Sequence, residues 1–223
     1  MKLILQIVLV LTAIFLGYKI FNSINEPTKF NTEKIKRYQV VVNKLKDLRA
    51  AELAHLEITG KFTDSYDTLV KFIETSQYAI TQRRDTSYPD VARNRAFNLD
   101  PLTGGYYLED VVIDTLGFIS VKDSLFKNSD RYKNLSKVTV EGQEIPITLK
   151  AGFIERNERQ MPVFEASAKK DDILHGMSSD LVIQEKQVVA VDGINGAEVT
   201  VGSMTDINTT GNWPKRYDSS KDE

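Results

Sequence analysis

Cysteine is absent from the 223 residues of this chain, and histidine occurs only twice. The lack of cysteine excludes disulfide bonds, lipid attachment of the lipoprotein type and a Cys/His catalytic dyad. Two histidines without any cysteine are too few ligands for an ordinary zinc site. A chain without disulfides is compatible with a periplasmic compartment and with a cytosolic one.

An excess of one charge is also missing, and glycine and proline are scarce. The chain has 29 Lys and Arg against 31 Asp and Glu, a formal net charge of −2. This balance provides no basic field for nucleic acid. Twelve glycines and six prolines are too few for a fibrous or disordered protein. We therefore expect a folded protein that does not bind nucleic acid.

The two histidines do not form part of a recognisable catalytic motif. His55 lies within a helical pattern, and His175 lies in the segment DILHGM, directly before Gly176. A structural role is the simpler interpretation of both, with His175 at the end of a helix. A Ser-His-Asp triad stays open by composition, but no Gly-x-Ser-x-Gly motif supports one.

Carboxylates gather at two places in the chain. Glu109-Asp110 with Asp114 could bind a cation, but adjacent residues of a strand point to opposite faces. Asp171-Asp172 is typical of a helix start, and neither group has the spacing of a calcium loop. The sequence thus predicts no catalytic, cofactor-binding or metal-binding residue, and it favours a protein that is not an enzyme.

The clearest feature is an uncharged run at the beginning of the chain. Leu3–Tyr18 (LILQIVLVLTAIFLGY) has no charge, and Lys19-Ile20-Phe21 extends it. Nineteen helical residues span roughly 28 Å, close to the hydrocarbon thickness of a bilayer. We expect residues 1–21 to be a retained transmembrane helix rather than a cleaved signal peptide, because no small-x-small cleavage site follows. The short N-terminal tail favours an N-in, C-out orientation, although a count of Lys and Arg favours the reverse.

A break and an amphipathic helix are predicted next. Pro27 disfavours the helical conformation of Glu26, so we expect a linker over residues 22–30. A helix is expected from Asn31 to about Ile58, packed on its own domain or, alternatively, against another helix, and Gly60 is the expected stop. Its apolar stripe consists of Ile35, Tyr38, Val42, Leu45, Leu48 and Leu56.

The rest of the chain is predicted to be α+β. A second short helix starts near Asp64, and the polar segment Gln77–Ala96, with Arg83, Arg84, Arg93 and Arg95, is expected to be an exposed connection. We assign residues 31–96 to a helical segment, 97–204 to a small, mostly antiparallel β domain, and 205–223 to a polar tail in which Trp213 docks. The expected strand runs are Tyr106–Leu108, Val111–Ile113, Phe118–Val121, Val138–Val140, Ile147–Ile154, Val163–Ala168, Leu181–Glu185, Val188–Val191 and Ala197–Gly202.

The order of these elements resembles the type IV pilins and the pseudopilins of type II secretion. Leu48–Phe72 (LRAAELAHLEITGKFTDSYDTLVKF) is similar to the end of the long helix in that family and its exit turn. Phe97–Tyr107 (FNLDPLTGGYY) is similar to the Asp-Pro-x-x-Gly-x-x-Tyr segment that leads into a pseudopilin sheet. The likeness covers about the first half of the chain. Three features differ. Gln6 stands near the place of the family's Glu, only Met1-Lys2 precede the apolar run, and the break expected around Pro27 interrupts the continuous long helix of the family.

The resemblance and the apolar run together suggest a role in assembly. We expect a single-pass protein of a bacterial inner membrane whose C-terminal domain is periplasmic. Its partners would be the bilayer and other envelope proteins, self-association included, in a secretion, pilus-like or motility apparatus. The alternative is a tethered domain that binds or senses a ligand, for which a concave pocket with converging polar groups would be expected.

Overall fold

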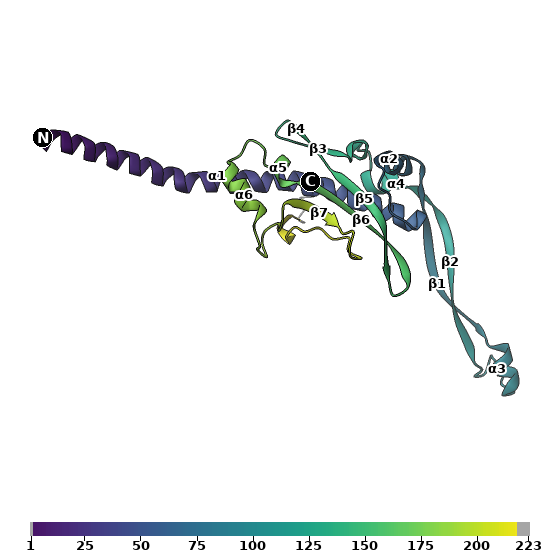
Figure 1. Ribbon diagram of the computed structural model, residues 1–223. Helices are drawn as coiled ribbons and strands as arrows, with labels where there is room; N and C mark the ends of the chain where they lie inside the picture. Colours follow the sequence, from purple (N-terminus) through teal and green to yellow (C-terminus); the bar gives the residue numbers. More distant parts are fainter. Residues whose placement is uncertain (1, 218–223) are drawn as a thin grey trace. The chain divides into compact units, whose positions relative to one another are not determined.

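The computed structural model describes residues 2–217, so the predictions for Met1 and for residues 218–223 lie outside the described residues. The chain is α+β, with a long apolar N-terminal helix and small antiparallel sheets, as the sequence predicted (Figure 1). It divides into two compact units: Met1–Lys71 with Ser129–Glu223, and Phe72–Asn128.

The helical elements and strands alternate along the second part of the chain. The helices are α1 (Lys2–Thr59), α2 (Tyr66–Thr75), α3 (Val91–Ala96), α4 (Val121–Phe126), the 3₁₀ helix η1 (Arg131–Asn134), α5 (Lys170–Ile173), α6 (Ser179–Lys186) and the 3₁₀ helix η2 (Lys215–Tyr217). The strands are β1 (Gln77–Pro89), β2 (Tyr107–Ser120), β3 (Lys137–Val140), β4 (Gln143–Pro146), β5 (Thr148–Arg156), β6 (Arg159–Lys169) and β7 (Glu198–Gly202).

Helix α1 is continuous through Pro27, so the predicted break over residues 22–30 is wrong. Proline has no N–H, and the carbonyl of Ser23, four residues earlier, therefore loses its helical partner. The loss is local, at about 3 kcal/mol. Three residues after Pro27, Phe30 is already buried in the core, which fixes the helical path on that side. Packing thus overrides the preference of a single residue.

The second part of α1 is the centre of the first unit. We call residues 30–59 the packed half of α1. It contacts β3, β6 and β7, and Tyr38, Val42, Leu45 and Leu48 of the predicted stripe are buried. The stripe is broader than predicted, because Val41, Ala51 and Ala54 are also buried, while Ile35 stays 42% exposed.

The exit from α1 follows the predicted pattern. The helix ends at Thr59, and Gly60 has a φ of +77°, the left-handed conformation that glycine adopts without steric cost. Phe62, two residues on, is buried, with its ring 4.6 Å from the ring of Phe164 on β6. The turn therefore fixes the end of α1 to the sheet.

Two small sheets complete the first unit. β3 and β4 form a hairpin closed by Glu141 and Gly142, both of which have a positive φ, as two-residue hairpin turns require. β5, β6 and β7 form an antiparallel sheet in that order. The strands predicted over Val138–Val140, Ile147–Ile154, Val163–Ala168 and Ala197–Gly202 are confirmed.

Two strand predictions in this unit are wrong. Leu181–Glu185 lies in helix α6, in which Val182 and Glu185 are buried one helical turn apart. In the sequence, the adjacent apolar residues Leu181, Val182 and Ile183 resemble a buried strand, so the helical spacing of Val182 and Glu185 is not evident. Val188–Val191 forms no strand; the N–H of Ala190 donates to the side chain of Asn195 instead, at 2.9 Å.

The second unit is built around one long hairpin. β1 pairs with β2 along its whole length, from Gln77 opposite Ser120 to Pro89 opposite Tyr107, with a bulge after Ile80. The exposed connection predicted over Gln77–Ala96 is therefore strand β1 followed by α3. Its sequence is mostly polar and does not alternate with a buried face, and the backbone pairing with β2 determines its conformation. The three short strands predicted between 106 and 121 belong to the single strand β2.

The C-terminal segment docks as predicted, and more extensively. Trp213 is buried, and so is Tyr217 of η2, whose role the sequence did not reveal. The rings of Tyr217 and Tyr38 lie edge to face at 6.3 Å, and the Tyr217 carbonyl accepts a hydrogen bond from Lys46 Nζ at 2.7 Å. The tail therefore covers part of the packed half of α1.

Candidate functional site

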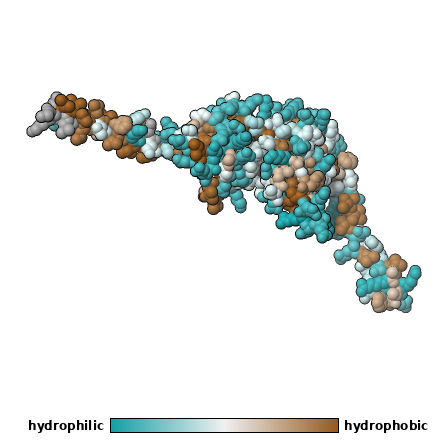
Figure 2. Space-filling view, viewed as in Figure 1, coloured by the Kyte–Doolittle hydropathy of each residue, from teal (hydrophilic) through white to brown (hydrophobic). Residues whose placement is uncertain are grey.

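The N-terminal part of α1 is a continuous run of exposed and mainly apolar side chains among the described residues. Every described side chain between residues 4 and 24 is exposed, and the large apolar ones expose between 53% and 67% of their surface. Figure 2 shows these apolar residues gathered along the helix. We call residues 4–24 the apolar half of α1. The helix is long and apolar enough to cross a membrane.

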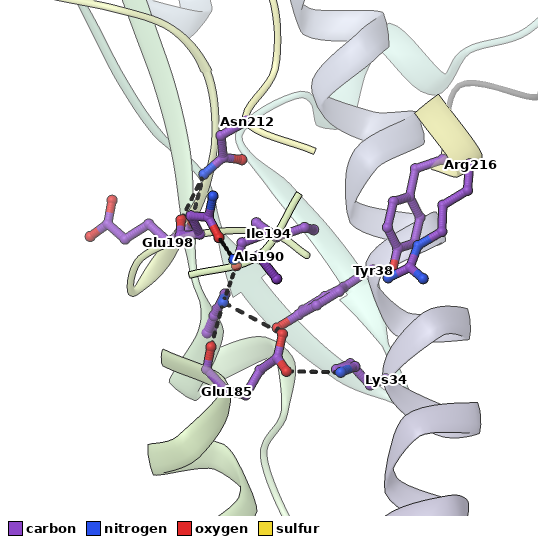
Figure 3. Close-up of polar contacts among 11 residues, drawn as sticks. Lys34, Tyr38, Glu185, Ala190, Ile194, Glu198, Asn212 and Arg216 are labelled. Carbon is purple, nitrogen blue, oxygen red and sulfur yellow. Dashed lines mark hydrogen bonds and ion pairs between the residues drawn. The ribbon is translucent and has the colours of Figure 1, made fainter. Parts of the chain in front are cut away.

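A polar cluster ties the packed half of α1 to the rest of the unit. The Glu185 carboxylate accepts hydrogen bonds from Lys34 Nζ at 2.8 Å and from Tyr38 Oη at 3.3 Å. Figure 3 shows Lys34 and Tyr38, one helical turn apart on α1, pointing toward Glu185 on α6. Arg37 donates to the carbonyls of Ile173 and His175, at 3.2 Å and 2.8 Å.

Lys170 completes this cluster from the start of α5. Its side chain is fully buried, and Nζ donates to the carbonyls of Glu185 at 2.8 Å and Ile194 at 2.6 Å. The Glu185 carboxylate lies 3.5 Å from the ammonium group. Burial lowers the pKa of Lys170, and Glu185 opposes this effect. Two carbonyls and the Glu185 carboxylate thus surround the ammonium group of Lys170. We therefore interpret the cluster as a structural joint between α1, α5 and α6 rather than as a reactive group.

Glu52 is a second buried ionisable residue of the packed half. Its side chain is fully buried, and one carboxylate oxygen accepts from the N–H of Thr63 at 3.1 Å. The other oxygen, Oε1, meets no hydrogen-bond donor among residues 2–217. Burial raises the pKa of Glu52 to about 7; the Thr63 N–H lowers it and the nearby Asp64 raises it. Glu52 therefore holds the exit turn and titrates near neutral pH.

The two histidines have different roles from Glu52 and Glu185, since each one contacts the backbone of a nearby turn or helix end. His55 is buried, and its Nδ1 lies 2.7 Å from the Lys61 carbonyl in the exit turn. His175 Nδ1 lies 2.8 Å from the Asp172 carbonyl, next to the end of α5. Both contacts are with nearby backbone, as a structural role predicts.

The carboxylates singled out in the sequence are not brought together. Asp110 and Asp114 lie on β2, opposite Thr86 and Gln82, and Asp114 is paired with Arg84 at 3.3 Å. Asp171 forms an exposed ion pair with Lys186 at 2.8 Å. Among residues 2–217, no group of three or more His, Asp and Glu side chains has an arrangement that could hold a metal ion.

An open groove of about 380 Å³ lies between α1, η1 and the β3–β4 hairpin. Charged side chains from all three elements line it, and four of the five form two ion pairs; the fifth, Lys44, donates to the Arg131 carbonyl at 3.1 Å. Arg131 lies 3.0 Å from Asp47, and Lys137 lies 2.7 Å from Glu144. The two pairs neutralise four of these charges, and Lys44 leaves the lining of the groove with a net charge of +1.

The hairpin of the second unit is the other large exposed surface. We call residues 77–120 the arm. Both strands are exposed over most of their length, and Ile113, Leu116 and Phe118 each expose about two thirds of their surface. Between the two strands, Arg93 of α3 is exposed, and its guanidinium group lies 3.9 Å from the ring centre of Tyr106.

Comparison of the chain with protein-family models, with characterised proteins and with solved structures found no match.

Proposed function

We propose that this protein is a membrane-anchored subunit of a multi-protein assembly in the cell envelope. The observation that carries the proposal is the continuity of α1. One helix leaves the bilayer-compatible apolar half and becomes the packed core of the first unit without a break. A continuous helix of this kind holds a folded domain in a defined orientation at a surface, as an assembly subunit requires.

The resemblance to type IV pilins and pseudopilins adds support. In that family the apolar helix continues directly into the amphipathic helix, and α1 does the same through Pro27. The segment after Gly60 also leads, as in that family, to a short helix and then to antiparallel strands. We place the apolar half in a bacterial inner membrane, as a single N-in, C-out span with the domain in the periplasm.

The proposal predicts membrane attachment and co-purifying proteins. Full-length protein should stay in the membrane fraction after a carbonate wash, and purification in a mild detergent should yield other envelope proteins, identified by mass spectrometry. A lone monomer in mild detergent, or protein recovered in the soluble fraction, would contradict the proposal.

A matched pair of variants isolates the role of the apolar half. Leu11→Arg places a charge at the centre of the span, at about 2.5–3.5 kcal/mol, and should release protein from the membrane. Ile35→Arg, at a half-exposed position beyond the span, should leave attachment unchanged. Equal behaviour of the two variants would show that the apolar half does not determine attachment.

The second candidate function is a tethered domain that binds a ligand, and the groove between α1, η1 and β3–β4 is the observation that favours it. The internal pairing of its charges makes it the weaker candidate.

A further inference from the structure

The arm is a two-stranded ribbon that no third strand covers among the described residues. β1 has 13 residues and β2 has 14, and nearly all of them are exposed. An isolated two-stranded ribbon is marginally stable in water, and three or more strands are normally needed. Each strand also directs half of its backbone N–H and C=O groups outward, where they can pair with a further strand.

The exposed apolar side chains of the arm are a second reason to expect a partner for it. Ile113 and Leu116 of β2 are each 65% exposed, and Phe118 is 67% exposed. Soluble proteins commonly protect long strand edges with charges, prolines or a covering element. Here three large apolar side chains lie within six residues of one uncovered strand.

The charges of the arm are divided between its two strands. β1 carries Arg83, Arg84 and Asp85, a net charge of +1, and β2 carries Glu109, Asp110 and Asp114, a net charge of −3. Pairing of β1 with β1 of another copy would place arginines together, and pairing of β2 with β2 would place carboxylates together. Arg83 also lies 3.7 Å from Asp85, and Arg84 lies 3.3 Å from Asp114, in exposed pairs of the kind that contribute little. Of the possible pairings, β1 against β2 alone joins strands whose net charges are opposite in sign.

We propose that the arm binds a second copy of this chain by strand addition, with the outer edge of β1 in one copy pairing with the outer edge of β2 in the next. Copies anchored side by side in one membrane have the same orientation, so β1 of one copy is antiparallel to β2 of its neighbour. This contact is head-to-tail, and it produces a ring or an open row of subunits rather than a closed dimer. The inference rests on the proposed function for the shared orientation.

The absence of cysteine allows a direct test in the full-length chain. Thr81→Cys on β1 and Thr115→Cys on β2 are exposed and lie opposite each other within the hairpin. The two single-cysteine proteins are mixed in lipid vesicles and oxidised with copper phenanthroline, which joins only cysteines in direct contact. In the proposed row, the same residue of neighbouring copies lies two strand spacings apart, about 9.6 Å, which is too far for a disulfide. Side-by-side arms should give a cross-link between the two variants, and neither variant should cross-link efficiently alone.

Charge reversal provides the control for specificity. Arg83→Glu/Arg84→Glu in the Thr81→Cys protein should lower the cross-link yield about tenfold, as should Asp110→Lys/Asp114→Lys in the Thr115→Cys protein. Mixing the two reversed proteins should restore the yield. Restoration cannot come from repair of the Arg84–Asp114 pair inside one hairpin, because that pair stays broken in both proteins.

Each outcome distinguishes this inference from the proposed function. Cross-links within a single variant would show a symmetric contact and overturn the inference, and so would a mixture that gives no cross-link. If the envelope proteins still co-purify in either case, the proposed function stands and the arm binds something other than a second copy. If co-purification fails as well, the proposed function fails with it.

Discussion

The two halves of α1 consist of similar apolar residues and differ in their surroundings. In the apolar half, Leu11 exposes 61% of its surface, whereas Leu45 in the packed half is fully buried. The two leucines lie on one uninterrupted helix. Helical conformation therefore does not distinguish a packed segment from a membrane-compatible one. The distribution of apolar residues does, because the packed half has an apolar stripe and the apolar half is apolar all round.

The largest loss of stability is expected when the joint between Glu185, Lys170 and the packed half of α1 is broken. Glu185→Ala should lower the free energy of unfolding by about 3–5 kcal/mol, because it leaves the buried ammonium of Lys170 without its counter-charge. Trp213 is the only tryptophan of the chain and is buried in the same unit, so its fluorescence in detergent micelles reports this unfolding.

An exposed ion pair of the same region is the matched control for this prediction. Asp171→Ala removes the partner of Lys186 and should change stability by less than about 1 kcal/mol. If Glu185→Ala had an effect as small as that of Asp171→Ala, the cluster would not be the joint described above.

The next largest effect comes from the same substitution in each half of α1, which compares the contributions of the two halves to stability. Leu45→Ala should lower the free energy of unfolding by about 2–5 kcal/mol, because it leaves a cavity in the core. Leu11→Ala removes the same atoms from an exposed position, and the denaturation midpoint followed by Trp213 should not move. Similar shifts in both variants would show that the apolar half packs on the domain.

Glu52 should make the stability of the packed half depend on pH. Its pKa is about 7 in the folded chain and about 4.5 in the unfolded one, so the folded state binds more protons between these values. The contribution of Glu52 to stability is therefore fully present below pH 4.5 and is lost as the pH rises through 7, by about 3 kcal/mol in total. Glu52→Gln should remove this fall. Denaturation curves at pH 5 and pH 8 measure it, and parallel losses in the two proteins would contradict the assignment.

The features that the sequence predicted depend on local patterns. The uncharged run, the stripe through Leu45 and Leu48, the stop at Gly60 and the turn at Gly142 are visible in short windows, and the structure has the helix, its end and the hairpin at these places. Such features depend on periodicity and on backbone conformation, which a few neighbouring residues determine.

The features that the sequence did not reveal depend on distant partners. β1 is polar and forms because β2 lies beside it, and α1 crosses Pro27 because packing begins at Phe30. The joint of Lys34, Tyr38 and Lys170 with Glu185 joins residues between 15 and 151 positions apart. One local signal for it is the spacing of Lys34 and Tyr38, because Tyr38 belongs to the apolar stripe and Lys34 lies one helical turn before it.

The most direct test of the account is the depth of α1 in a bilayer. Single cysteines at Val8, Phe15, Ile24 and Lys36 would carry nitroxide labels in vesicles, and accessibility to oxygen and to a water-soluble relaxation agent would give the depth of each. We predict that labels at residues 8 and 15 lie within the hydrocarbon, that the label at 24 lies near the headgroups, and that the label at 36 lies in water. Equal access of the water-soluble agent to all four positions would contradict the central claim that one helix is both membrane span and domain core.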